Sequence, residues 1–164
     1  MSAGTRIAVV AGVLLALAGG VGGGGAHAQA PAQAVEAVPV QGLSFGRLLP
    51  GVPETVSTAD AARRAEIILS GTGSFDVLLV LPDALVNADG ARIPLRFGAR
   101  DGAVMRNPSA PLLPFNPLEM GRVQIQESAG PARLLLGGTA VPAPSQAAGT
   151  YQATVVLIVN NPGT

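Results

Sequence analysis

Cysteine and tryptophan are absent from this chain of 164 residues, and histidine and tyrosine occur once each. The single histidine, His27, falls in an N-terminal segment that we expect to be removed, which leaves a chain with neither histidine nor cysteine. These absences exclude Ser–His and Cys–His nucleophilic sites, zinc sites built from His or Cys, haem and iron–sulfur ligation, and thiol redox chemistry. We therefore predict no catalytic, metal-binding or cofactor-binding residues, no cofactor, and no enzyme activity.

Charged residues are also scarce. They make up 12% of the chain, and 10 basic residues balance 10 acidic ones. Nucleic-acid binding requires a basic excess, so nucleic acid is not an expected partner. Hydrophobic residues make up 48% of the chain, which is typical of a packed globular domain.

The N-terminus has the features of a secretory signal peptide. Arg6 precedes an apolar run from Ile7 to Ala18, and Ala26-His27-Ala28 is a small-x-small cleavage site. The apolar run is too short to span a hydrocarbon core of about 30 Å. We predict that residues 1–28 are cleaved, that no membrane span remains, and that the protein is exported to the periplasm, the outer surface or the medium.

The rest of the chain is expected to contain one domain. Residues 29–40 are rich in Ala, Pro and Gln, which predicts a flexible or extended tail. Residues 41–164 are predicted to form the folded domain, which is large enough to be held by its hydrophobic core without disulfides.

Apolar residues alternate with polar ones along most of that domain, which is the pattern of half-buried strands. Gly-rich, Asn-rich and Asp-rich turns separate these segments. The sequence therefore predicts an all-β protein with a single antiparallel β-sandwich of immunoglobulin-like or pilin-like type. The expected strands surround Leu43 and Phe45, Phe75 to Leu81, Ile93 to Phe97, Val123 and Ile125, Arg133 to Leu136, and Tyr151 to Val159.

One segment allows two interpretations. Ser57 to Leu69 begins with a capping-box pattern and has apolar residues at helical spacing. The alternative is a loop followed by a strand over Ala65 to Ser70, with Ile67 and Leu69 inward and Glu66 outward. The strand is favoured because a lone helix within a run of strands is the less common arrangement.

The order of several motifs resembles a family of exported bacterial proteins. Leu43-Ser44-Phe45-Gly46, Ser70-Gly71 before a strand ending in Leu81-Pro82, Leu136-Gly137-Gly138-Thr139, and Gln146 to Tyr151 look like the "domain of unknown function 4402". The resemblance covers about Val40 to Val159. It implies a Gram-negative exported β-sandwich related to pilin-like and spore-coat-like subunits, and it brings no catalytic residue with it.

Individual residues in these motifs have structural interpretations. Gly46, Gly138 and Gly149 are predicted at sharp bends or at positive φ. Tyr151 is predicted to pack its ring in the core and to bond its hydroxyl to nearby backbone.

Acidic and basic side chains are also expected to serve the fold. Asp76, Asp83, Asp89 and Asp101 show no shared motif spacing, so turn formation is favoured over calcium binding or glycosidase chemistry. Arg92 and Arg96 are predicted on the solvent face of a strand, with binding of an anionic ligand alongside Arg100 and Arg106 as the alternative. The Pro-rich segment from Asn107 to Pro117 is predicted to be an irregular lid, or a partner-binding loop.

These observations favour an exported, non-catalytic structural or adhesive protein of the bacterial cell envelope or surface, such as a pilin-like subunit. Its expected partners are further copies of itself or other envelope subunits. The alternative is a periplasmic module that binds a glycan or another small ligand. A third hypothesis, an enzyme, has no motif to support it.

Overall fold

The computed structural model describes residues 5–6, 8–11, 35–106, 110–119, 121–125 and 130–160. Within these ranges the chain forms strands, turns and bends and contains no helix, which confirms the all-β prediction. Accordingly, nothing in the described part of the chain provides a helix of the length and hydropathy that a membrane crossing needs.

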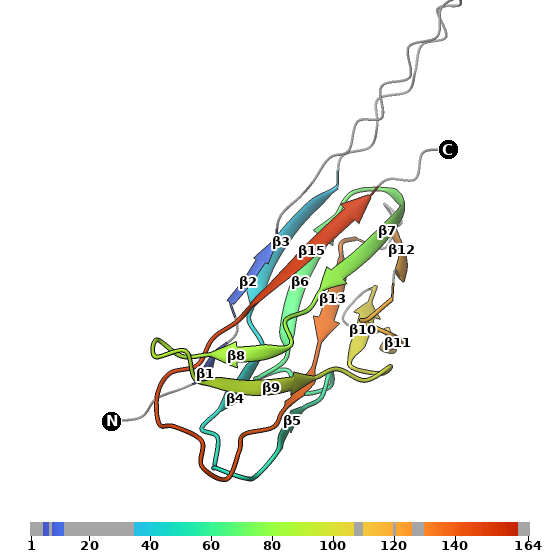
Figure 1. Ribbon diagram of the computed structural model, residues 1–164. Helices are drawn as coiled ribbons and strands as arrows, with labels where there is room; N and C mark the ends of the chain where they lie inside the picture. The colour runs from blue at the N-terminus through green and yellow to red at the C-terminus, as the bar shows by residue number, and fades with distance from the viewer. Residues whose placement is uncertain are drawn as a thin grey trace, which may run out of the picture.

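Two sheets contain the long strands, which run side by side along the molecule (Figure 1). Neighbouring strands are antiparallel except for one parallel pair, β2 with β15. The first sheet has the order β12 (Gly121–Ile125), β7 (Gly73–Val80), β15 (Thr154–Asn160) and β2 (Ala8–Ala11). The second has the order β11 (Leu113–Phe115), β10 (Gly102–Met105), β13 (Ala132–Leu136), β6 (Ala65–Ser70) and β3 (Glu36–Gln41).

Shorter strands form a third sheet, in which β8 and β9 run across the direction of the long strands in Figure 1. Its order is β5 (Glu54–Val56), β14 (Gly138–Ala140), β9 (Arg92–Arg96) and β8 (Ala84–Val86). In addition, β1 (Thr5–Arg6) pairs with β4 (Ser44–Gly46).

Gly137 lies where the chain passes from the second sheet, in β13, to the third, in β14. A β-carbon at this position would lie 2.3 Å from the carbonyl oxygen of Val56, so only glycine allows the two backbones to approach this closely. Gly137 thus allows the bend between the two sheets. Gly46 (66°), Gly138 (157°) and Gly149 (154°) have positive φ, as the sequence predicts.

The core lies between the sheets and is built from alternate residues of each strand. Phe75, Val77 and Leu79 of β7 point inward, as the sequence predicts, and all three are buried. The sheets together enclose a single hydrophobic cluster in a sandwich-like arrangement. Other members of this cluster include Leu43, Phe45, Ile67, Leu69, Ile93, Leu95, Leu134, Val155, Leu157 and Val159.

The ambiguous segment contains the predicted strand. Residues 58–63 form turns, and β6 covers Ala65–Ser70 with Ile67 and Leu69 buried. The expectation that Glu66 points to solvent is wrong, because its side chain is buried and accepts hydrogen bonds from the Arg64 and Arg133 side chains.

Strands also occur in the segment predicted as a flexible or extended tail and in the segment predicted as an irregular lid. β3 (Glu36–Gln41) begins in the tail, ends at the first residue of the predicted domain, and pairs with β6. The Pro-rich segment contains β11, which pairs with β10, and the Phe115 ring lies so close to Gly102 that a β-carbon there would be 2.8 Å from it. The prediction of irregular structure is thus wrong for Leu113–Phe115. Residues 107–109 of the same segment lie outside the described residues.

Candidate functional site: the edge of strand β15

The acidic residues considered as catalytic or calcium-binding candidates lie in separate places and have local partners. Asp76 pairs with Arg122 across β7 and β12 (2.8 Å), and Asp83 pairs with Arg92 (2.9 Å). Asp101 accepts a hydrogen bond from the backbone N–H of Gly98 (2.7 Å), which is the predicted turn role. In the parts of the chain that the structure describes, no group of three or more His, Cys, Asp or Glu residues could hold a metal ion.

The turn around Asp89 is held by a different residue from the one expected. The Asn87 side-chain oxygen accepts hydrogen bonds from the backbone N–H of Asp89 (3.1 Å) and of Ala91 (2.7 Å). Asn87 is buried, so its side chain fixes the hairpin between β8 and β9.

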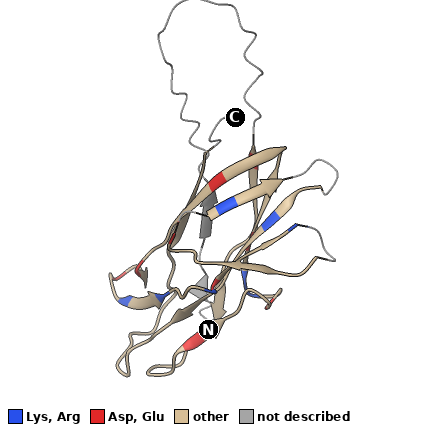
Figure 2. Ribbon diagram, turned by 90° about the vertical axis from the view of Figure 1, so that its right-hand side faces the viewer, with Lys and Arg blue, Asp and Glu red and all other residues tan. Residues whose placement is uncertain are grey.

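The arginines do not form one anion-binding face. Arg92 and Arg96 are exposed on the outer face of β9, as predicted, but β10 separates Arg100 from Arg106. Figure 2 shows the basic and acidic positions spread over several strands and loops.

A buried charge cluster, which the sequence did not indicate, lies on the outer face of β6 and β13. Glu66 accepts hydrogen bonds from Arg64 (3.1 Å) and from Arg133, and Arg64 also donates to the carbonyl of Thr58 (3.0 Å). Burial alone would raise the pKa of Glu66, but the two arginines outweigh it and the pKa lies below its ordinary value. Because the cluster ties the loop before β6 to the sheet, we interpret it as structural.

Tyr151 fixes the start of the last strand in the way the sequence predicts. Its ring is buried, and its hydroxyl donates to the carbonyl of Ala147 (2.7 Å) and accepts from the Gln146 amide (2.7 Å). Three residues later the chain enters β15.

β15 is an uninterrupted apolar strand with the sequence TVVLIVN. Val155, Leu157 and Val159 point into the core. On the opposite face Val156 and Ile158 lie directly across from Val80 and Leu78 of β7, so this outer face is aliphatic as well. The strand contains no charge, proline or glycine at which pairing with another strand would stop.

The other long side of β15 is paired with the N-terminus of the same chain. β2 runs parallel to β15, with Ala8 opposite Thr154 and Ala11 opposite Leu157. β2 also lies against β3. We call the position that these N-terminal strands occupy, next to β15 on one side and to β3 and β4 on the other, the β15 groove.

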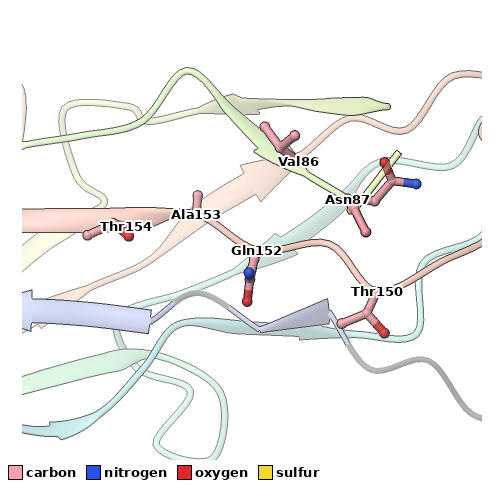
Figure 3. Close-up of a pocket in the computed structure, with 7 residues that line it drawn as sticks. Val86, Asn87, Thr150, Gln152, Ala153 and Thr154 are labelled. Carbon is pink, nitrogen blue, oxygen red and sulfur yellow. The ribbon is translucent and has the colours of Figure 1, made fainter. Parts of the chain in front are cut away.

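A cleft of about 650 Å³ opens at the start of β15, between the end of β8 and the segment that follows Tyr151 (Figure 3). A backbone bridge joins Val86 to Gln152, which both line it. The described residues of its lining are neutral, with hydroxyl and amide groups beside small apolar side chains: Val86, Asn87, Ala88, Thr150, Gln152, Ala153 and Thr154. The sequence could not indicate this cleft, because residues far apart in the chain form it.

The remaining sheet edges carry features that oppose further pairing. β3 contains Glu36 and Pro39, and its register shifts between Pro39 and Gln41. β12 has the Arg122–Asp76 ion pair on its outer face, and β5, β8 and β11 are three residues long. β15 is therefore the longest and most apolar strand among the described edges, once residues 1–28 are set aside.

No protein-family model matches the chain, and the curated proteins contain no match to it. The likeness to the domain of unknown function 4402 therefore stays a prediction from motif order. The site itself offers no catalytic group, but it offers backbone donors and acceptors next to apolar side chains, which is the chemistry of strand addition.

Proposed function

We propose that the protein is an exported, non-catalytic structural subunit of the bacterial cell envelope or surface, with a pilin-like sandwich that assembles by accepting an extended strand at the edge of β15. The observation that supports this most directly is the pairing of β2 with β15. β2 lies within the predicted signal peptide, so cleavage after Ala28 would leave the backbone groups of an apolar strand without this partner. Such an edge favours pairing with another chain.

The proposed donor is the tail of a second copy. Val35 is buried and β3 begins at Glu36, so only residues 29–34 can leave their own molecule. Six extended residues reach about 20 Å, which matches a pairing of similar length on β15. β3 begins at the end of the molecule where β15 ends (Figure 1), so a donor segment attached to β3 starts from that end of the β15 groove.

Size-exclusion chromatography and electron microscopy of the chain lacking residues 1–28 test this assembly. We expect oligomers or fibres, and we expect monomers when Gln29 to Ala34 are also deleted. Oligomers that persist after the deletion would show that the tail is not the donor.

A pair of matched substitutions tests the acceptor. Val156 and Val80 lie directly opposite each other on the same outer face, but only Val156 belongs to the β15 edge. Val156→Lys should abolish assembly, because a charged lysine on an edge strand opposes pairing. Val80→Lys should leave assembly intact, and equal effects of the two substitutions would argue against the β15 edge.

The cleft supports a second candidate function, binding of a neutral, hydroxyl-rich ligand such as a glycan. Thr150, Gln152 and Thr154 are exposed there, and none of the described residues that line it is ionisable. If a glycan array identifies a ligand, Gln152→Ala should weaken its binding about tenfold or more, and Gln124→Ala on β12 should not change it.

A further inference from the structure

The backbone of the N-terminal segment contacts both walls of the β15 groove. Thr5–Arg6 pairs with β4 on one side, and Ala8–Ala11 pairs with β15 on the other. The register places Val9 opposite Val155 and Val10 opposite Val156. The groove thus holds two short strands of the same chain, β1 by main-chain pairing with β4 and β2 by main-chain pairing with β15.

That occupant has a composition suited to strand pairing. Ala8–Ala11 reads AVVA, with small and β-branched apolar residues and no charge, glycine or proline. It also lies in the apolar run of the predicted signal peptide, so the same residues serve two expected purposes, targeting before cleavage and groove occupation in the uncleaved chain.

We propose that Thr5–Arg6 and Ala8–Ala11 act as an intramolecular ligand of the β15 groove, which keeps the uncleaved precursor closed to strands from other subunits until the segment is removed. This inference rests on the proposed function for its biological meaning. Its physical content is independent of assembly, since it requires only that the groove binds this segment and that the attached segment competes with a free strand.

Attachment makes that competition strong. A segment that belongs to the same chain as its site has an effective concentration of about 1 mM there. If the segment as a free peptide has a dissociation constant of about 10 µM for the open groove, its effective concentration is about 100 times that constant, so a competing strand would bind the precursor about 100-fold more weakly.

A labelled synthetic peptide of residues 5–12 (TRIAVVAG) tests the groove directly by fluorescence anisotropy. The peptide should bind the chain lacking residues 1–28, and it should bind the full chain about 100-fold more weakly. A peptide carrying Val9→Pro and Val10→Pro should bind neither, because proline removes ladder donors and fixes φ. Equal binding to the full and shortened chains would overturn the inference, as would no binding to a shortened chain that is folded.

Substitutions in the full chain test the competition with a matched control. V9P/V10P should open the groove and restore peptide binding to within a few-fold of the shortened chain. G22P/G23P adds the same two prolines outside the described residues and should leave the groove closed. A shortened chain that folds only when the peptide is added would also support the inference, because the peptide would then supply the missing strand.

Chromatography of the same samples separates this inference from the proposed function. A shortened chain that binds the peptide yet stays monomeric would contradict the assembly proposal and leave the inference standing. If the full and shortened chains assemble to the same extent, the result would contradict the inference and leave the assembly proposal standing.

Discussion

β3 and β15 border the same groove but protect their edges in different ways. β3 has the sequence EAVPVQ, with a charge, a proline and a register shift, and its Val38 and Val40 side chains are 43% and 56% exposed. β15 has none of these devices, and three of its seven residues are buried. The comparison teaches that one edge is protected by its own sequence, whereas the other depends on a partner strand.

The largest expected difference between the two strands concerns stability. Leu157 of β15 is fully buried, so Leu157→Ala should lower the free energy of unfolding by about 2–5 kcal/mol. Val38→Ala on β3 should change it by less than about 0.5 kcal/mol, because that side chain is largely exposed. Urea denaturation of both variants measures this, and similar losses would show that β3 contributes to the core as much as β15.

The second test acts on the sheet that carries β3. Glu66 on β6 accepts hydrogen bonds from two arginines and is almost fully buried, so Glu66→Gln should cost about 1.5–3 kcal/mol by weakening charge-assisted bonds. Because its folded pKa lies below the ordinary value near 4.5, its contribution is present above that pH and is lost as the pH falls through the folded pKa.

Thermal melts between about pH 6 and pH 3 check the sign. The melting temperature of the natural chain should fall on acidification more steeply than that of Glu66→Gln. Parallel curves would show that Glu66 contributes no pH-dependent stability.

A smaller effect is expected at the start of β15. Tyr151→Phe removes the hydroxyl that bonds to Ala147 and Gln146, so it should cost about 1 kcal/mol and loosen the start of β15. Hydrogen exchange should become faster in residues 147–155 and stay unchanged in β3. Faster exchange in both strands would indicate that they respond as one unit.

Pro39→Val removes the proline that interrupts β3, and only a small change in stability is expected from it. The substitution restores a backbone N–H in this edge strand, so we expect less than about 1 kcal/mol in stability but a gain in self-association. Light scattering over a concentration series detects such a gain. A variant that stays as dispersed as the natural chain would show that Glu36 and the register shift protect this edge without the proline.

Sequence patterns predicted the strands whose alternation is long and clear. The inward faces of β7 and β9, the start of β6 and the role of Tyr151 are found where the pattern puts them. The short strands β5, β8 and β14 were missed, because three residues are too few to show a period. β3 was not predicted as a strand for a different reason, because Glu36 and Pro39 interrupt its apolar alternation.

The candidate site was not predictable, even though β15 itself was predicted as a strand. Whether a strand is central or at an edge depends on which segments pair with it, and the partners of β15 lie in β7 and in the N-terminus. Likewise, Glu66 is buried against Arg64 and against Arg133 of the neighbouring strand, which alternation along β6 does not reveal. Local patterns specify faces, whereas tertiary pairing specifies edges and clefts.

The position of β15 at the end of the chain also bears on how the protein folds. β15 pairs with β7, which precedes it by roughly half the length of the chain, and it supplies three core residues. A chain that crosses a membrane from its N-terminus would deliver β7 long before β15. β7 would therefore lack its pairing partner β15 until the end of the chain had crossed. Such non-local pairing slows folding. Until β15 is in place, the unpaired side of β7 would be open to pairing with a strand of another molecule.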